Sequence, residues 1–571
     1  MASALSRSFF KPQNDDIVSI LEEAHDTGPA STKLVCTIGP VSNDVDTLCE
    51  LLGAGMSMAR FDFSFGDAAF HRVGLDNLRS AVQRTRKLCA TVMDTLGPEI
   101  VVINRSPEPI ALEAGQVVTL TCDAATPASS AALPISYPSL EGAGLVAGRN
   151  IFVGQYLFTG SETTSAYLTV QSLSPDGRSV TCLVANSCVL EGVQLTVHFG
   201  NMANAAPILS DQDKRALLQF GKANAVDFVA LSFTRCAADV AEARAYIDAI
   251  GMRNAKIIAK IENKEGLANY AEIIGAADAV ILSRGSMGNC LDPEKMFIAQ
   301  KLLLTECNYA GKPIYVTRVV DTMTDAPRPT RAEATDVANL VLDGADGIVL
   351  GSETFRGKFP VVAAETVVAI TRQAEQSYDS YRYYQHVTGR MGLNSLETRM
   401  TEKTEALAMA AVRAATKLRA ALIVVFTVTG RTARLIAKYR PSQPVLTVVV
   451  PGVTSDGLKW VCNGDFVARQ CLHYRGVQPI CADASVGRPD GAVLTAALKV
   501  AQGRGLTRPG DRVVVLQCPR VQKLYADSMQ EAGVVKILTL GSDGVGTIKA
   551  SAVLNAAGHV VGSREADEGR A

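Results

Sequence analysis

A lysine and a glutamate two positions apart, at the end of an apolar run, form the pattern best suited to chemistry. Lys260, Ile261 and Glu262 follow the run Ala255–Ala259. In a β-strand, side chains alternate between faces, so Lys260 and Glu262 project one way and Ile261 the other. Such an ammonium–carboxylate pair can face a metal–phosphate substrate. It also fits a surface strand with a weak ion pair, so the other strand ends must decide between the two.

The composition is that of an ordinary globular protein. At 571 residues the chain should contain several domains, because one domain takes roughly 100–200 residues. The net charge of −1 gives no indication of nucleic-acid or anionic-membrane partners. The 13 cysteines include no CxxC pair, which favours buried thiols in a reducing compartment. No apolar run reaches the roughly 18 residues of a membrane helix.

The N-terminus, residues 1–31, is expected to be an extension packed on the first domain. Its Ser-containing start resembles a transit peptide, which is the less favoured alternative. Acidic residues follow closely at Asp15, Asp16, Glu22 and Glu23, whereas transit peptides are poor in acids.

Eight short β-rich segments recur after Ser31, with helix-like stretches between most of them. The segments are Leu34–Ile38, Met58–Phe63, Leu88–Asp94, Asp227–Phe233, Lys256–Ile261, Asp278–Arg284, Pro313–Arg318 and Asp346–Ser352. The helical stretches include Asp44–Leu52, Asp211–Asn224 with Ser210 as N-cap, and Pro293–Asn308. This alternation predicts a (β/α)8 TIM barrel over residues 32–99 and 206–390.

Two further domains are predicted outside the barrel. Residues 100–205 contain alternating runs, such as Gln116–Thr121, Asn150–Val153, Ala166–Gln171, Ser179–Val184 and Gln194–His198, between turn residues. They indicate an inserted small β-barrel domain that serves as a lid. Residues 397–550 combine the helix Glu402–Lys417 with the strands Ala421–Thr427, Pro444–Val450, Arg512–Leu516 and Val535–Leu540, which favours an open α/β domain. Residues 551–571 are expected to form a mobile tail.

Polar residues gather where the barrel strands end, which is where barrel enzymes place their active sites. The second strand puts Arg60, Asp62 and Ser64 on one face and Phe61 and Phe63 on the other. Other strands end in Asp94–Thr95, Lys260 with Glu262, Arg284–Ser286, Thr317–Arg318 and Ser352–Glu353. Cations, hard oxygen ligands and hydroxyls at one mouth suit metal-assisted phosphoryl or enolate chemistry. The alternative is an ordinary polar barrel rim.

Several motifs together resemble pyruvate kinase. They are Thr37–Pro40, Ala59–Ser64, Asp94–Glu99, Ile257–Gly266 and Arg328–Glu333, and the resemblance covers about residues 32–545, including the insert. Phe152–Gly160 and Val316–Met323 are similar to the plant-type cytosolic branch. The resemblance implies a cytoplasmic homotetramer that transfers the phosphoryl group of phosphoenolpyruvate to ADP and protonates the resulting enolate. It also implies Mg²⁺ (or Mn²⁺) and K⁺ as cofactors.

The resemblance also implies residue roles, by position. Lys260 stabilises the phosphoryl group in transit and Arg60 holds the phosphate. Glu262 binds the divalent metal, with Ser286 as a possible second ligand. The Gly285 backbone and Thr317 contact the substrate, and Thr317 lies near the face where the enolate is protonated. The potassium site corresponds to Asp62, Ser64, Asp94 and Thr95, with Glu99 typical of potassium-requiring members. The nucleotide pocket corresponds to Thr37, Pro40 and Arg60.

Four departures from the family pattern bear on activity. Ser286 stands where most members have a metal-binding Asp, and a neutral hydroxyl is a weak ligand for a hard dication. Cys290 replaces an acidic residue, Leu96 a lysine and Val101 an arginine. One alternative is therefore a catalytically weakened paralogue with a regulatory or structural role. Another is a different barrel enzyme that handles enolates, such as a phosphoenolpyruvate-using aldolase or lyase, which would need no nucleotide.

A candidate anion-binding loop lies in the C-terminal region. Thr427, Thr429, Gly430, Arg431 and Thr432 place hydroxyls and backbone N–H groups at the start of a predicted helix. In the family, the matching loop holds the phosphate of a sugar-bisphosphate activator where one is used. The alternative is a helix cap without a ligand, and plant-type members are generally not controlled in this way.

Overall fold

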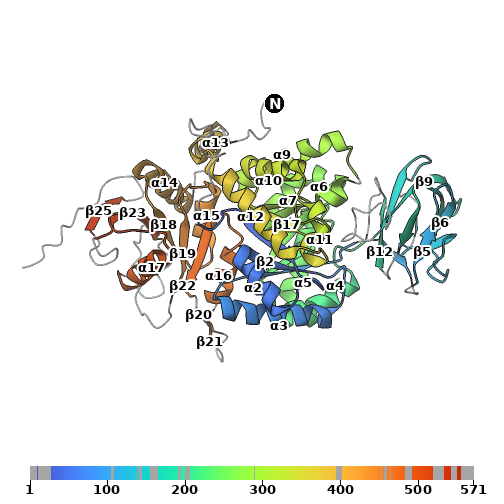
Figure 1. The fold of residues 1–571 in the computed structure, drawn as a ribbon, viewed down its shortest axis with the longest axis horizontal. Coiled ribbons are helices and arrows are strands. Elements are labelled where there is room, and N and C mark those ends of the chain that lie inside the picture. The colour runs from blue at the N-terminus through green and yellow to red at the C-terminus, as the bar shows by residue number, and fades with distance from the viewer. Residues whose placement is uncertain are drawn as a thin grey trace, which may run out of the picture.

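The computed structural model describes the chain in segments that leave out its least certain stretches. The described residues are 9–10, 28–98, 100–104, 108–137, 139–140, 145–154, 165–190, 194–199, 206–288, 290–393, 402–451, 453–455, 460–462, 464–482, 491–517, 533–541 and 549–554. Figure 1 shows a central barrel between an all-β domain at one end and an α/β domain at the other. No helix within these segments is both long and apolar enough to cross a membrane.

The eight predicted strands close into a parallel barrel, as expected. They are β1 (Lys33–Thr37), β2 (Met56–Asp62), β3 (Ala90–Asp94), β13 (Phe228–Leu231), β14 (Lys256–Ile261), β15 (Ala279–Leu282), β16 (Ile314–Thr317) and β17 (Gly347–Leu350). The order around the barrel is β1-β17-β16-β15-β14-β13-β3-β2. Every strand therefore pairs with two neighbours, and all eight C-terminal ends open at one mouth.

Most helices of this domain cover the outside of the barrel, and short helices follow β14, β15 and β17 directly at the mouth. The helices are α2 (Val45–Ala54), α3 (Ala68–Thr85), α4 (Asp211–Ala216), α5 (Ala237–Ala249), α6 (Lys264–Ala268), α7 (Tyr270–Ala276), α8 (Arg284–Gly288), α9 (Pro293–Ala310), α10 (Arg331–Asp343), α11 (Ser352–Phe355) and α12 (Pro360–Gln376). The predicted cap is confirmed, since the Ser210 hydroxyl accepts from the Asp213 amide and the Asp213 carboxylate accepts from Ser210 in return. Beyond α4, the predicted single helix continues as a π-helical stretch, Leu217–Lys222.

The barrel interior is a small apolar core closed from below by the C-terminal domain. Met58, Phe228, Ile258 and Tyr315 belong to this inner cluster, and Leu472 of the C-terminal domain packs against it. The Tyr315 hydroxyl donates to the His473 carbonyl at 2.8 Å. The N-terminal face of the barrel is thus plugged, which leaves the opposite mouth for chemistry.

The insert is all β, with the five predicted runs appearing as β6, β8, β9, β10 and β12. Its strands are β4 (Ile100–Ile103), β5 (Ile110–Leu112), β6 (Val117–Thr121), β7 (Ala132–Pro134), β8 (Asn150–Gly154), β9 (Ser165–Leu173), β10 (Ser179–Val184), β11 (Cys188–Leu190) and β12 (Gln194–Phe199). Seven of them form one sheet, β4-β12-β8-β9-β10-β6-β7, and β11 pairs with β5. In the described part of the insert, its two edges meet at an isolated bridge between Val102 and Ile135, beside a hydrogen bond from the Val101 amide to the Ser136 hydroxyl, and this is where the predicted small β-barrel closes.

The C-terminal domain is an open α/β sheet in the order β22-β19-β18-β23-β24-β25. Its elements are α14 (Lys403–Leu418), β18 (Leu422–Thr427), α15 (Arg431–Lys438), β19 (Val445–Val449), β20 (Val453–Ser455), β21 (Trp460–Cys462), α16 (Gly464–Cys471), β22 (Val477–Cys481), α17 (Gly491–Gly503), β23 (Arg512–Gln517), β24 (Val534–Thr539) and β25 (Lys549–Leu554). The four predicted strands appear as β18, β19, β23 and β24.

The chain ends pack differently from one another. The expected start of a mobile tail at residue 551 is wrong, because β25 pairs antiparallel with β24 through Leu554. Residues 555–571 lie outside the described segments. At the other end, Phe9 is buried against Tyr378 and Tyr383, and its amide donates to the Leu342 carbonyl. Tyr383 belongs to α13 (Ser380–Leu393), the helix that leads toward the C-terminal domain.

Candidate active site

Lys260 lies at the mouth of the barrel within a cluster of oxygen atoms. Its ammonium nitrogen is 3.1 Å from Asp94 Oδ1, 2.9 Å from Ser232 Oγ and 3.7 Å from Glu262 Oε1. Burial disfavours the charge, yet the carboxylates of Asp94 and Glu262 raise the pKa of Lys260 above its ordinary value. Lys260 therefore stays cationic at neutral pH and can face an anionic substrate.

The predicted faces of β2 and β14 are confirmed. Arg60 contacts Asp62 at 2.5 Å, and the Ser64 hydroxyl donates to Asp62 at 2.7 Å, so these three side chains share the mouth. Phe61 and Phe63 instead pack in the core between the barrel and its helices, which also contains Ile261. The strand period of two thus explains why the polar residues converge.

Arg60 connects three strands. Its Nε donates to Asp94 at 2.6 Å, and its Nη1 donates to the Thr37 hydroxyl at 3.0 Å. Burial opposes the charge on Asp62, but the Arg60 guanidinium holds the pKa of Asp62 below its ordinary value. These contacts hold the Arg60 guanidinium in place at the mouth before any substrate binds.

Glu262 is buried beneath Lys260 and held by two donors. Its Oε2 accepts from the Phe233 amide at 2.7 Å, and its Oε1 accepts from the Ser286 hydroxyl at 3.2 Å. Phe233 has a φ of 55°, a strained value for a residue with a side chain, and this conformation accompanies the amide contact to Glu262. Glu262 and Ser286 are therefore adjacent, as the strand ends predict.

Thr317 and Gly285 come from neighbouring strand ends. The Thr317 hydroxyl accepts from the Arg284 amide at 3.2 Å, and Arg284 Nε donates to the Thr317 carbonyl at 2.9 Å. Gly285 is half-buried in the short helix α8. An open cavity with about 500 Å³ of empty space is lined by Thr317, Arg60, Asp94, Lys260, Ile281, Ser283, Arg318, Val349, Gly351 and Ser352.

The residues of the expected nucleotide pocket differ in their exposure to solvent. Pro40 is exposed at the rim, whereas Thr37 is fully buried and its hydroxyl donates to the Leu350 carbonyl at 2.7 Å. Thr37 thus supports Arg60 from below. Thr95 is buried, with its hydroxyl donating to the Ala230 carbonyl. Glu99 lies outside the described residues.

The sequence interpretation missed two supporting residues. Ser232 binds Lys260 and donates to the Thr95 carbonyl at 2.5 Å, and its only signal was a hydroxyl at the end of a predicted strand. Asp213 accepts from the amides of Leu96 and Gly97 at 2.8 and 3.0 Å, which fixes the loop after β3. Asp213 lies more than 100 residues away along the chain, so no local pattern indicated this contact.

The oxygen ligands present suit hard cations. Mg²⁺ commonly takes one or two protein carboxylates and completes its shell with water and substrate phosphate. Glu262 with the Ser286 hydroxyl fits that pattern, although no group of three or more His, Cys, Asp or Glu within the described part of the chain could hold a metal alone. Asp62, Ser64, Asp94 and Thr95 offer hard oxygen atoms at the adjacent strand ends, which fits K⁺.

The candidate anion loop of the C-terminal domain is held by internal contacts. The Gly430 amide donates to the Thr427 hydroxyl at 3.0 Å, and Arg431 pairs with Glu402. Thr432 is buried at the start of α15, and Gly430 adopts a φ of 80° as its N-cap. The N-cap residue Gly430 has no side chain that could cap the first amides of α15.

A pH effect on stability is predicted from Glu353, which lies beside this mouth. Burial raises the pKa of Glu353 to about 7, and the Asp321 carboxylate adds to the rise. Between about pH 5 and pH 7 the unfolded chain ionises this group while the folded chain keeps it protonated, so stability falls as pH rises, by up to about 3 kcal/mol. Glu353→Gln should flatten this slope in urea unfolding measured across pH.

Glu365→Gln is the matched control, because Glu365 is exposed on α12. Its curve of stability against pH should follow that of the wild type. Parallel curves for wild type and Glu353→Gln would contradict the prediction.

Two family models match the chain. The model "Pyruvate kinase, barrel domain" matches residues 30–364, and "Pyruvate kinase, alpha/beta domain" matches residues 405–530. Together they span the barrel, its insert and most of the C-terminal domain.

Relatives and solved structures agree with these models. The chain is 46% identical to "Pyruvate kinase 2, cytosolic" of Oryza sativa subsp. indica, over 92% of this chain and 97% of that protein. It is 39% identical to "Pyruvate kinase, cytosolic isozyme" of Glycine max, over 88% and 97%. The structure of Cryptosporidium parvum pyruvate kinase in complex with ADP matches with a TM-score of 0.77 at 31% identity, over 92% and 98% of the two chains. The chain belongs to the pyruvate kinase family.

Proposed function

We propose that this protein is an active pyruvate kinase that converts phosphoenolpyruvate and ADP to pyruvate and ATP, the last step of glycolysis. The observation that carries this is the buried Lys260, kept cationic beside Arg60 at a barrel mouth with Glu262 and Thr317. Since the rice and soybean relatives are named cytosolic, we expect the same compartment for this protein.

In the reaction, the bond between phosphorus and the enol oxygen breaks, and a new bond forms between phosphorus and a terminal oxygen of ADP. Lys260 and Arg60 hold the phosphoryl oxygens from two sides, which favours the charge distribution of the transition state. Neither cation must reorganise, because Asp94 fixes both of them. The enolate then takes a proton at its terminal carbon, on the side where we place Thr317.

The proposed metal ligands are Glu262 and Ser286 for Mg²⁺ or Mn²⁺, and Asp62, Ser64, Asp94 and Thr95 for K⁺. When bound, these cations would neutralise phosphate charge. Without metal, the Ser286 hydroxyl and the Phe233 amide keep the Glu262 carboxylate oriented. Thr37 is proposed to position Arg60, and exposed Pro40 to border the nucleotide.

A coupled assay of pyruvate formation tests the function. Turnover should require ADP, Mg²⁺ or Mn²⁺, and K⁺. No turnover with all of them present would overturn the proposal, and rapid turnover of phosphoenolpyruvate without ADP would favour the aldolase or lyase alternative.

We further propose a homotetramer, supported by two adjacent apolar side chains on α9. Phe297 and Ile298 are 56% and 43% exposed, and exposed apolar side chains gathered at one place favour a protein interface. Phe297→Glu should therefore lower the mass measured by light scattering after size-exclusion chromatography. Val73→Glu is the control, since Val73 is 55% exposed on the distant helix α3 and its variant should keep the wild-type mass. An unchanged mass for Phe297→Glu would exclude this face.

A further inference from the structure

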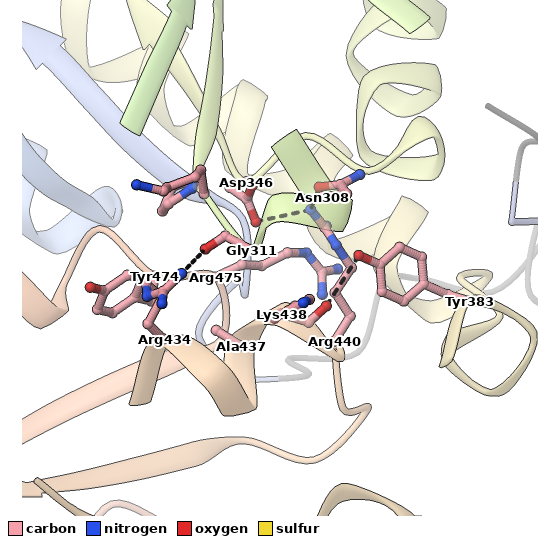
Figure 2. Close-up of a pocket in the computed structure, with 12 residues that line it drawn as sticks. Asn308, Gly311, Asp346, Tyr383, Arg434, Ala437, Lys438, Arg440, Tyr474 and Arg475 are labelled. Atoms are coloured by element: carbon pink, nitrogen blue, oxygen red, sulfur yellow. Dashed lines mark hydrogen bonds and ion pairs between the residues drawn. The ribbon is translucent and has the colours of Figure 1, made fainter. Parts of the chain in front are cut away.

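A narrow cavity lies where the N-terminal side of the barrel meets the C-terminal domain. Figure 2 shows Gly311 and Asp346 of the barrel on one side, and Arg434, Lys438 and Arg440 of the α15 region on the other. The cavity has a volume of about 20 Å³ and is partly open to solvent. That is room for one small ion or a water molecule.

The lining of this cavity is strongly cationic. It contains five basic side chains but one carboxylate, that of Asp346; the basic residues are Lys312, Arg434, Lys438, Arg440 and Arg475. Two of the cations are neutralised, since Arg440 Nη2 lies 2.9 Å from Asp346 and Lys438 Nζ lies 2.6 Å from Glu405. A third cation, Arg475, has its Nη2 3.8 Å from Glu375 Oε1, which leaves Lys312 and Arg434 without a carboxylate at ion-pair distance among the described residues.

Arg434 and Lys312 contact only neutral oxygen atoms. Arg434 Nη1 donates to the Gly311 carbonyl at 3.0 Å, and Lys312 Nζ donates to the Ala277 carbonyl at 2.5 Å. Within the described segments, neither side chain forms an ion pair. Burial lowers the pKa of Lys312, and although Asp278 opposes this, the neighbouring Arg434 charge lowers it further. The site is therefore short of negative charge.

Arg475 is almost fully buried, and its ion pair with Glu375 is long. Its side chain is 5% exposed, and its Nε has no hydrogen-bond partner among the residues described. Its nearest carboxylate oxygen, Glu375 Oε1, is 3.8 Å from Nη2 and already accepts from the Thr32 amide and hydroxyl. The guanidinium carbon of Arg475 also lies 5.1 Å from the centroid of the Tyr378 ring, a cation–π contact that offsets part of the cost of burial. A bound anion in the cavity would offset more of that cost.

We propose that this cavity binds one small inorganic anion of about the size of chloride. The anion would lie between Lys312 on the barrel and Arg434 on the C-terminal domain, and would tie the two domains together. The cavity volume of about 20 Å³ suits a small ion better than a phosphorylated metabolite. The proposal concerns stability and does not depend on the catalytic activity.

Exchange of anions tests the proposal on the full chain. At constant potassium concentration, replacing gluconate by chloride should raise the thermal unfolding midpoint in a saturable way, because gluconate is too large to enter. The double variant Lys312→Gln with Arg434→Gln should need at least about tenfold more chloride for the same response, after losing two charge-assisted contacts. Arg413→Gln is the control, because Arg413 is exposed on α14, and it should respond as the wild type does.

Bromide gives a direct second measurement that needs no variant. Wild-type crystals grown with bromide should show an anomalous scattering peak between Lys312 and Arg434. Equal midpoints in chloride and gluconate, or an undiminished chloride response in a folded double variant, would overturn the proposal. So would bromide peaks that lie elsewhere on the protein and leave this cavity empty.

Discussion

Lys260→Met is expected to lower kcat about a thousandfold, the usual scale for removing one preorganised charge at a transition state. Methionine keeps the length and apolar stem of lysine, so the change isolates the ammonium group. That group is buried and contacts Asp94 and Ser232, so water cannot easily replace it. The measurement is steady-state pyruvate formation with saturating ADP, metal and K⁺.

Lys256→Met is the matched control for this prediction. Lys256 lies on the same strand, β14, four residues before Lys260, and its Nζ donates to the Tyr474 hydroxyl at 3.1 Å at the opposite end of the barrel. Removing it also deletes a partly buried ammonium that makes a hydrogen bond, so folding should be disturbed in a comparable way while kcat stays within about threefold. If Lys260→Met kept kcat within about tenfold of the wild type, Lys260 would not be the phosphoryl-stabilising charge.

The sequence was sufficient for those features that repeat locally. The period of two at Arg60–Ser64 and Lys260–Glu262 predicted which side chains share the mouth, because the faces of a strand are fixed by the backbone. The eight strands and the Ser210 cap followed from similarly local patterns. The predicted strands and helices differ from the structure mainly at their ends.

Contacts between segments that are distant along the chain could not be predicted from local sequence patterns. The support of Glu262 by the Phe233 amide depends on a left-handed residue whose type gives no signal. The burial of Thr37 follows from its contact with Leu350, more than 300 residues away. Strand β25 exists because β24 offers a free edge, although its own sequence is weakly patterned. Such features depend on tertiary packing, which a single sequence does not display.

Glu262→Gln is expected to raise the half-saturating Mg²⁺ concentration by about a hundredfold or more and to lower kcat. Glutamine keeps the shape of the side chain but removes the charge that a hard dication requires. Of the two proposed metal ligands, Glu262 is a carboxylate and Ser286 is a neutral hydroxyl. Glu262 would therefore supply all of the negative charge that these two residues offer the metal. Glu265→Gln is the control, because Glu265 is exposed three residues further on and its change should leave the metal requirement as it is.

Ser286→Asp separates an active enzyme from a weakened paralogue. In either case the added carboxylate should lower the half-saturating Mg²⁺ concentration, by about tenfold. If the wild type is already fast, kcat should change little, because Lys260 and Arg60 already hold the phosphoryl group. A large gain in kcat from a slow wild type would instead support the weakened paralogue. If neither Glu262→Gln nor Ser286→Asp changed the half-saturating Mg²⁺ concentration appreciably, the metal would have to bind elsewhere in the mouth.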